Sequence, residues 1–101
     1  MAWEIKLTKR ALKQVEKLPL GIRERVYFLL KEMKSHGPYL ETWPELFRLR
    51  FKNYGKLSGF ENKYHCHLKK GKPTYIACWE IHKKVILVEF YYVGTHEKAP
   101  Y

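Results

Sequence analysis

The stretch that decides the fold is Lys63–Val93, which reads KYHCHLKKGKPTYIACWEIHKKVILVEFYYV. It holds three runs typical of β-strands, at residues 63–68, 74–81 and 85–93, with turn signals between them. The last two runs are strongly apolar, as strands covered on one or both faces should be. We therefore expect three consecutive antiparallel strands in this part of the chain.

The segment before these strands predicts one more strand and two helices. Residues 3–7 alternate apolar and charged side chains, which indicates a half-buried strand. Thr8 is placed to cap a helix that runs to about Lys17, and a second helix is expected over residues 20–35, ended by Gly37. Their expected core faces are Ala11, Leu12, Val15 and Leu18 on the first helix and Ile22, Val26, Leu29, Leu30 and Met33 on the second.

Two segments between the helices and the strands are less regular. Residues 38–46 form an aromatic loop interrupted by prolines. Residues 47–57 alternate basic and apolar side chains, so a short edge strand and an extended basic arm both fit. The whole pattern predicts an α+β fold in one domain over residues 1–101. In it, an antiparallel sheet of about four strands carries an N-terminal two-helix hairpin on one face.

The charge balance points to a polyanionic partner. Twenty Lys and Arg residues against ten Asp and Glu give a formal net charge of +10. Such an excess suits RNA, DNA, the ribosome or an acidic protein, although a charged surface also serves solubility alone. No run is long enough to span a bilayer and no signal peptide is evident, so we expect a cytoplasmic protein. In that compartment Cys66 and Cys78, both within strand patterns, are expected to be buried free thiols.

Two histidines on the first of the three strands suggest acid–base chemistry. His65 and His67 are two residues apart, so on a strand both project from one face, while Tyr64, Cys66 and Leu68 project from the other. With Lys69 next on their face, they could bind phosphate and move protons near neutral pH. Metal-free RNA cleavage needs such a base and acid, with cations for the developing charge. The alternative is a pair of exposed histidines without a role.

Zinc binding is a competing use of these residues. The candidate ligands are His65, Cys66, His67, Cys78 and His82. Cys66 is expected to point away from its two histidine neighbours, and the chain has no CxxC or HxxxH spacing. A tetrahedral site needs ligands that converge, so we expect no metal and no cofactor.

Basic and aromatic side chains elsewhere suggest contacts with nucleic acid. Arg48, Arg50 and Lys52 fit a phosphate-contact surface, or a charged edge that prevents strands of other molecules from pairing. Aromatic side chains that are candidates for base stacking are Tyr54, Tyr64, Tyr91 and Tyr101.

An ordered set of short motifs resembles the RelE/ParE toxin superfamily. The motifs are Leu57–Leu68 (LSGFENKYHCHL), the helix start Lys9–Lys13 (KRALK) and Val93–His96 (VGTH). The resemblance is nearest to RelE-type mRNA interferases of the histidine-using, YafQ-like branch. It implies a RelE-like fold and a type II toxin that cuts mRNA in the ribosomal A site without metal and is inhibited by a cognate acidic antitoxin. ParE-like members share the fold but poison DNA gyrase, so a non-catalytic gyrase poison or a basic RNA- or ribosome-binding module is the alternative.

The resemblance also implies roles for individual residues. His67 and His96 match the family's histidines and would share the acid–base work, with His65 on the phosphate and Tyr101 as the terminal aromatic that contacts the substrate. The chain departs from RelE in having Pro73-Thr74 in place of a Tyr-Arg pair, and His96 in place of an arginine. The candidate catalytic residues are therefore His65, His67, His96 and Tyr101, and the candidate RNA- and phosphate-binding residues are Arg48, Arg50, Lys52, Lys69, Lys70, Lys72 and Lys98.

Overall fold

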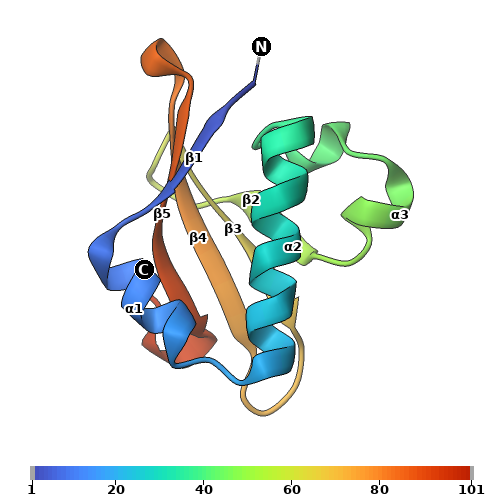
Figure 1. Ribbon diagram of the computed structural model, residues 1–101, viewed down its shortest axis with the longest axis vertical. Coiled ribbons are helices and arrows are strands. Elements are labelled where there is room, and N and C mark those ends of the chain that lie inside the picture. The colour runs from blue at the N-terminus through green and yellow to red at the C-terminus, as the bar shows by residue number, and fades with distance from the viewer. Residues whose placement is uncertain (1, 101) are drawn as a thin grey trace.

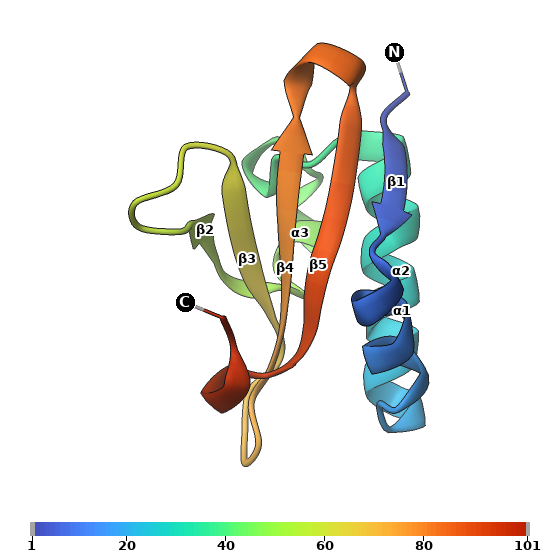
Figure 2. The same cartoon turned by 90° about the vertical axis from the view of Figure 1, so that its left-hand side faces the viewer.

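The computed structural model describes residues 2–100 and consists of one sheet with the α-helices on one side (Figures 1 and 2). In chain order its elements are β1 (Glu4–Leu7), α1 (Lys9–Glu16), α2 (Leu20–His36), η1 (Leu40–Thr42), α3 (Glu45–Arg48), β2 (Lys52–Lys56), β3 (Lys63–Lys69), β4 (Tyr75–His82), η2 (Lys83–Val85), β5 (Leu87–Thr95) and η3 (His96–Lys98). Within residues 2–100 no helix combines the length and the apolar character that a membrane crossing requires.

The sheet confirms the predicted α+β class and differs from the prediction in two details. Its strand order is β1-β5-β4-β3-β2, with five strands where about four were expected. The fifth is β2, so the basic segment contains an edge strand preceded by the short helix α3. All neighbours are antiparallel except β1 and β5, which run parallel. No hairpin connects β1 to β5, so their connection does not force them to be antiparallel.

The main core lies between the helices and the inner face of the sheet, meaning the face that the helices cover. Both predicted helices are confirmed, and their core faces are largely as expected. Leu12 is the exception, with 52% of its surface exposed, because the short helix α1 buries only Ala11 and Val15, one turn apart. The other buried side chains of this core include Val26, Leu29, Met33, Leu40, Trp43, Phe51, Cys66, Leu68, Trp79, Val88 and Phe90.

Thr8 joins the start of α1 to the sheet. Its side-chain oxygen accepts a hydrogen bond from the Ala11 amide at 3.1 Å, as expected of an N-cap. Its own amide donates to the carbonyl of Phe90 on β5 at 2.9 Å. The residue therefore both begins the helix and fixes the helix against the central strands.

Two of the tyrosines proposed for base stacking are partly buried and stack on rings of the core. The ring of Tyr54 stacks on Tyr64, with centroids 5.8 Å apart, and on Trp79 at 6.1 Å. Tyr54 can turn inward because β2 has an extra residue between its pairings with His65 and His67. Both residues are partly buried and pack against the main core, where each ring stacks on the other and on Trp79.

Two further irregularities in strand pairing move side chains to the opposite face from the one expected. Between His67 and Lys69 the register shifts, so Lys69 lies opposite Tyr75, whose ring packs on the main core. Lys69 is therefore on the helix side, and the expectation that it shares a face with the histidines is wrong. A second shift lies between the pairs Cys78–Tyr92 and Trp79–Phe90. Strict alternation along β5 would place Tyr92 on the face of Val88 and Phe90, whereas the shift places it on the outer face, away from the helices.

The Thr8 cap leads to a stability prediction. Thr8→Ala should lower the free energy of unfolding by about 1 kcal/mol, because the Ala11 amide loses its acceptor. For a domain of this size that corresponds to a melting temperature lower by about 4–8 °C. Thr8→Ser keeps the hydroxyl and should behave like the wild type in thermal and urea unfolding. Equal stabilities for the alanine and serine variants would contradict the assignment.

Candidate active site

Three histidines meet on the outer face of the sheet. β3 contributes His65 and His67, whose ring centroids are 6.1 Å apart. His96 begins η3, directly after β5, and its ring lies 5.5 Å from that of His67 at an angle of 64°. His65 and His67 are partly buried and His96 is exposed. Three imidazoles from two separate parts of the chain therefore border one solvent-facing site.

Two hydrogen bonds at the end of β5 place His96 beside His67. The amide of His96 donates to the carbonyl of Thr74 at 2.8 Å, and the hydroxyl of Tyr92 donates to the carbonyl of Thr95 at 2.7 Å. The segment then crosses the outer face, on the opposite side of the sheet from α1 and α2 (Figure 2). There it covers a small second core formed by Ile76, Cys78 and Tyr92, with Tyr91 and Ala99 packed against it.

Gly94 allows Tyr92 to reach that position. A Cβ atom at Gly94 would lie 2.7 Å from the Tyr92 hydroxyl oxygen and 3.0 Å from the carbon that bears it. A larger residue would push the ring away and break its hydrogen bond to Thr95. Gly94 and Tyr92 are thus part of the support for His96, which the strand pattern alone did not reveal.

The backbone holds His65 in a defined orientation. Its Nδ1 lies 3.1 Å from the carbonyl oxygen of Gly55, so Nδ1 carries the proton and donates it. Burial lowers the pKa of His65, the Gly55 carbonyl raises it in part, and His96 lowers it further. The neutral imidazole then presents Nε2 as an acceptor.

His67 lies between its two histidine neighbours. Burial lowers its pKa first, and the nearby charges of His65, His96 and Lys70 lower it further. The side-chain amide of Asn53 contacts the ring, with its nitrogen 3.4 Å from Nδ1. A lowered pKa keeps this imidazole neutral near pH 7, and a neutral imidazole can accept a proton.

A cavity of about 480 Å³ adjoins this cluster. His67 and His96 line it together with Lys72, Thr74 and Glu97. The β3–β4 turn therefore brings an ammonium group to the same opening as two imidazoles. This combination can hold a phosphodiester group and exchange protons with it.

The other predicted cations do not all lie near this cavity. Lys52 is the register partner of His67 on β2, and Lys98 lies in η3. Arg50 lies on the helix side, with its guanidinium 4.6 Å from the centre of the Phe28 ring, and Lys69 lines a cavity on that side. Arg48 is an exposed residue at the end of α3, and Tyr101 lies outside the described residues.

The zinc ligands considered from the sequence do not converge. Cys66 is buried in the main core, on the opposite face from His65 and His67, and Cys78 is buried in the small outer core. Burial raises the pKa of both thiols, that of Cys78 to about 12, which disfavours the thiolate that zinc binds.

A different set of possible metal ligands was missed from the sequence. Glu80, His82 and Glu89 each offer a ligand atom, and these atoms lie within 4.8 Å of one another. Asn62 donates to the second oxygen of Glu80 at 3.0 Å. The three side chains are partly exposed on β4 and β5, and they are not part of the cavity beside His67.

Comparisons with known proteins support the fold. No protein-family model matches the chain, and no curated protein matches it. Among solved structures, an arginine-to-alanine mutant of the E. coli toxin RelE in the free state aligns with a TM-score of 0.70 and 23% identity, over 98% of this chain and 88% of that one. RelE in the RelE–RelB complex of Pyrococcus horikoshii aligns with a TM-score of 0.67 and 17% identity, over 98% of this chain and 100% of that one. A metal-bound toxin from Helicobacter pylori aligns with a TM-score of 0.66 and 18% identity, over 97% of this chain and 98% of that one.

These similarities confirm the RelE-like fold expected from the sequence motifs. At such identities they establish the fold and carry no activity over to this chain. What the site does must be argued from its own residues.

The support for His96 can be tested through the titration of His67. Tyr92→Phe should raise the pKa of His67 toward its ordinary value, because loss of the bond to Thr95 lets the charge of His96 move away. Gly94→Ala should act in the same direction. His96→Ala sets the upper limit of the change, and NMR of the imidazole carbons measures all three. An unchanged His67 titration in both support variants would contradict the role given to Tyr92.

The lowered pKa values also predict how stability depends on pH. Because the folded-state pKa of His65 and His67 lies below the unfolded value, the unfolded chain binds more protons near pH 6. The stability that the neutral imidazoles contribute is present above the unfolded pKa of 6.5, and it is lost as pH falls through that value and on through the lower folded pKa values. The decrease in the free energy of unfolding on acidification should be smaller in His67→Gln than in the wild type, as measured by urea unfolding at a series of pH values. Identical pH slopes for the two proteins would contradict the burial argument.

Proposed function

We propose that this chain is the toxin of a type II toxin–antitoxin system and acts as a RelE-type endoribonuclease on mRNA. The observation that carries the proposal is the meeting of His65, His67 and His96 beside one cation-bordered cavity. That cavity lies on the outer face of the sheet, in a chain that has the RelE-like fold. The site contains a proton acceptor, a proton donor and positive charge, the three functions that RNA cleavage without metal requires.

In the proposed reaction the histidines move two protons. Neutral His67, with its lowered pKa, takes the proton of the ribose 2′-hydroxyl. The 2′-oxygen then bonds to phosphorus, the bond from phosphorus to the 5′-oxygen breaks, and protonated His96 gives its proton to the leaving oxygen. Lys72, and Lys70 next to His67, offset the charge that develops on the phosphate. Lys69 takes no part, because its side chain is on the other side of the sheet.

Finer features of the proposal draw on the resemblance and on charge. The use of histidines in place of RelE's arginine fits the YafQ-like branch, and Tyr101 would contact the substrate as the family's terminal aromatic does. A net charge of +10 suits both the ribosome and an acidic antitoxin. Solved RelE toxins of the same fold are held in complexes with RelB, the antitoxin. We therefore propose a ribosome-dependent cytoplasmic toxin with an antitoxin partner.

Removing either proton-transferring group should strongly slow cleavage. His67→Gln and His96→Gln should each slow ribosome-dependent mRNA cleavage by about 100-fold or more, the usual contribution of one acid or base. Primer extension on transcripts incubated with ribosomes measures the product. His36→Gln is the matched control, since His36 lies on α2, on the other side of the sheet.

The folded state of each variant is checked by its melting temperature, which should be near that of the wild type. If both variants cut at the wild-type rate, the assignment of the site is wrong. If the wild type binds ribosomes but produces no cut, the chain is a non-catalytic module and the nuclease proposal fails.

A further inference from the structure

Glu80, His82 and Glu89 form a group of oxygen and nitrogen donors that we call the hairpin cluster. Glu80 and His82 lie near the end of β4 and Glu89 near the start of β5, and they alternate with side chains of the main core, so they lie on the outer face. Ile76 on β4 is the register partner of His67. His82 lies six residues further along β4, or about 20 Å away. The hairpin cluster is therefore separate from the proposed cleavage site.

The separations within the hairpin cluster suit a shared ion better than direct hydrogen bonds. His82 Nε2 lies 3.7 Å from Oε1 of Glu80 and 3.6 Å from Oε1 of Glu89, whereas N–H···O bonds measure about 2.7–3.2 Å. Oxygen and nitrogen ligands bind Zn²⁺ at about 2.0–2.2 Å, so two ligands of a tetrahedral site lie about 3.3–3.6 Å apart. Donor atoms of all three side chains lie within 4.8 Å of one another, and small side-chain rotations complete the geometry.

The two carboxylates of the hairpin cluster face each other and form no ion pair with a lysine or arginine among residues 2–100. Glu80 and Glu89 are register partners on β4 and β5, an arrangement in which like charges repel. Lys63 is the partner of Glu80 on β3, but its ammonium lies over two aromatic rings, 4.5 Å and 5.1 Å from their centres. Lys6 is the partner of Glu89 on β1, but it pairs with Glu4 at 3.6 Å. A divalent cation between the carboxylates would remove their repulsion.

Asn62 orients one of these carboxylates from outside the hairpin cluster. Its side-chain amide donates to Oε2 of Glu80 at 3.0 Å. The other oxygen of that carboxylate, Oε1, is the one that faces His82. Carboxylates that bind metal ions are held in the same way, by a hydrogen bond that directs the remaining oxygen toward the ion.

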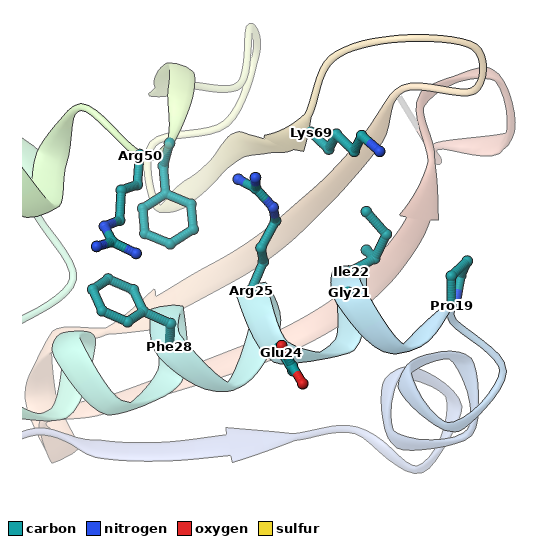
Figure 3. Close-up of a pocket in the computed structure, with 9 residues that line it drawn as sticks. Pro19, Gly21, Ile22, Glu24, Arg25, Phe28, Arg50 and Lys69 are labelled. Carbon is teal, nitrogen blue, oxygen red and sulfur yellow. The ribbon is translucent and has the colours of Figure 1, made fainter.

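The cavities described by the structure are less suited to a cation. The cavity of about 750 Å³ on the helix side is bordered by Arg25, Arg50 and Lys69, and we call it the cationic cleft. Glu24, the carboxylate that borders it, points away from Arg25 and Lys69 (Figure 3). In the cavity beside the histidines, the ammonium of Lys72 opposes a metal ion. The hairpin cluster, with two carboxylates and an imidazole, is the better cation site.

We propose that the hairpin cluster binds a divalent transition-metal ion through Oε1 of Glu80, Nε2 of His82 and a carboxylate oxygen of Glu89. An imidazole nitrogen beside carboxylates suits Zn²⁺, whereas Mg²⁺ and Ca²⁺ prefer oxygen ligands alone. Three protein ligands leave a fourth position for water. The ion links β4 to β5 and neutralises the facing carboxylates. The proposed cleavage reaction uses none of these residues, so the site does not depend on it.

Calorimetric titration of the chelator-treated, full-length chain with Zn²⁺ tests the site. At about pH 7.5, where imidazole is largely neutral, one Zn²⁺ ion should bind to the hairpin cluster. Amide NMR shifts on addition of Zn²⁺ should be concentrated at residues 62–63, 80–82 and 87–89. Mg²⁺ should bind at least about 100-fold more weakly, because it gains little from the imidazole.

Matched variants locate the ion. His82→Gln and Glu89→Gln should each weaken Zn²⁺ binding by at least about 100-fold, because each removes one of three ligands. Asn62→Ala keeps all three and should weaken binding by about tenfold. His36→Gln is the control, since His36 also pairs with a carboxylate, that of Glu32 at 3.2 Å, and its Kd should change by less than about twofold. Melting temperatures without metal check that each variant is folded.

Four outcomes would overturn the proposal. The first is the absence of Zn²⁺ binding by the wild type, and the second is an equal affinity of the wild type and His82→Gln. Loss of binding in His67→Gln without loss in His82→Gln would assign the ion to the histidine cavity. Equal affinities for Zn²⁺ and Mg²⁺ would show attraction by the carboxylates alone. Each can occur whether or not the chain cuts mRNA, so failure here is distinct from failure of the nuclease proposal.

Discussion

One irregularity in β3, the register shift at Leu68, determines the surroundings of both cavities. On the N-terminal side of the shift, His65 and His67 project to the outer face of the sheet. After it, Lys69 projects to the helix side, and the carbonyl of Leu68 accepts a hydrogen bond from Arg25. A regular strand would place Lys69 on the same face as His67 and would alter the contact with α2. The separation of an imidazole site from a cationic cleft across one sheet depends on this bulge.

A second, smaller core lies on the outer face of the sheet and positions the side chains of the histidine site. Ile76, Cys78 and Tyr92 are covered by the segment that follows β5, and packing and two hydrogen bonds hold residues 95–99 of that segment in place. These contacts bring His96 to His67. A surface that would otherwise be a bare sheet thus becomes a site lined by β3, by the β3–β4 turn and by the segment that follows β5.

Hydrophobic periodicity predicted the two long helices, four of the five strands and the burial of Cys66 and Leu68 opposite the histidines. It failed where a strand contains an extra residue, because a period of two carries no sign of a bulge. Lys69 lies on the opposite face from the one predicted for that reason. Tyr54, predicted as a stacking platform for bases, turns toward the core at the irregularity in β2. It also gave no position for Arg50, which packs on Phe28 through tertiary contacts. The proximity of His67 and His96 depends on strand register and was expected only from the family resemblance.

The central claim is that His67 and His96 act together on one phosphodiester bond. A double-mutant cycle tests it most directly, with ribosome-dependent cleavage rates for His67→Gln, His96→Gln and the double variant. Groups that act as a unit are not additive, so the double variant should be about as slow as the slower single variant. If the two losses multiply, the histidines act independently, and the account of a shared site is contradicted.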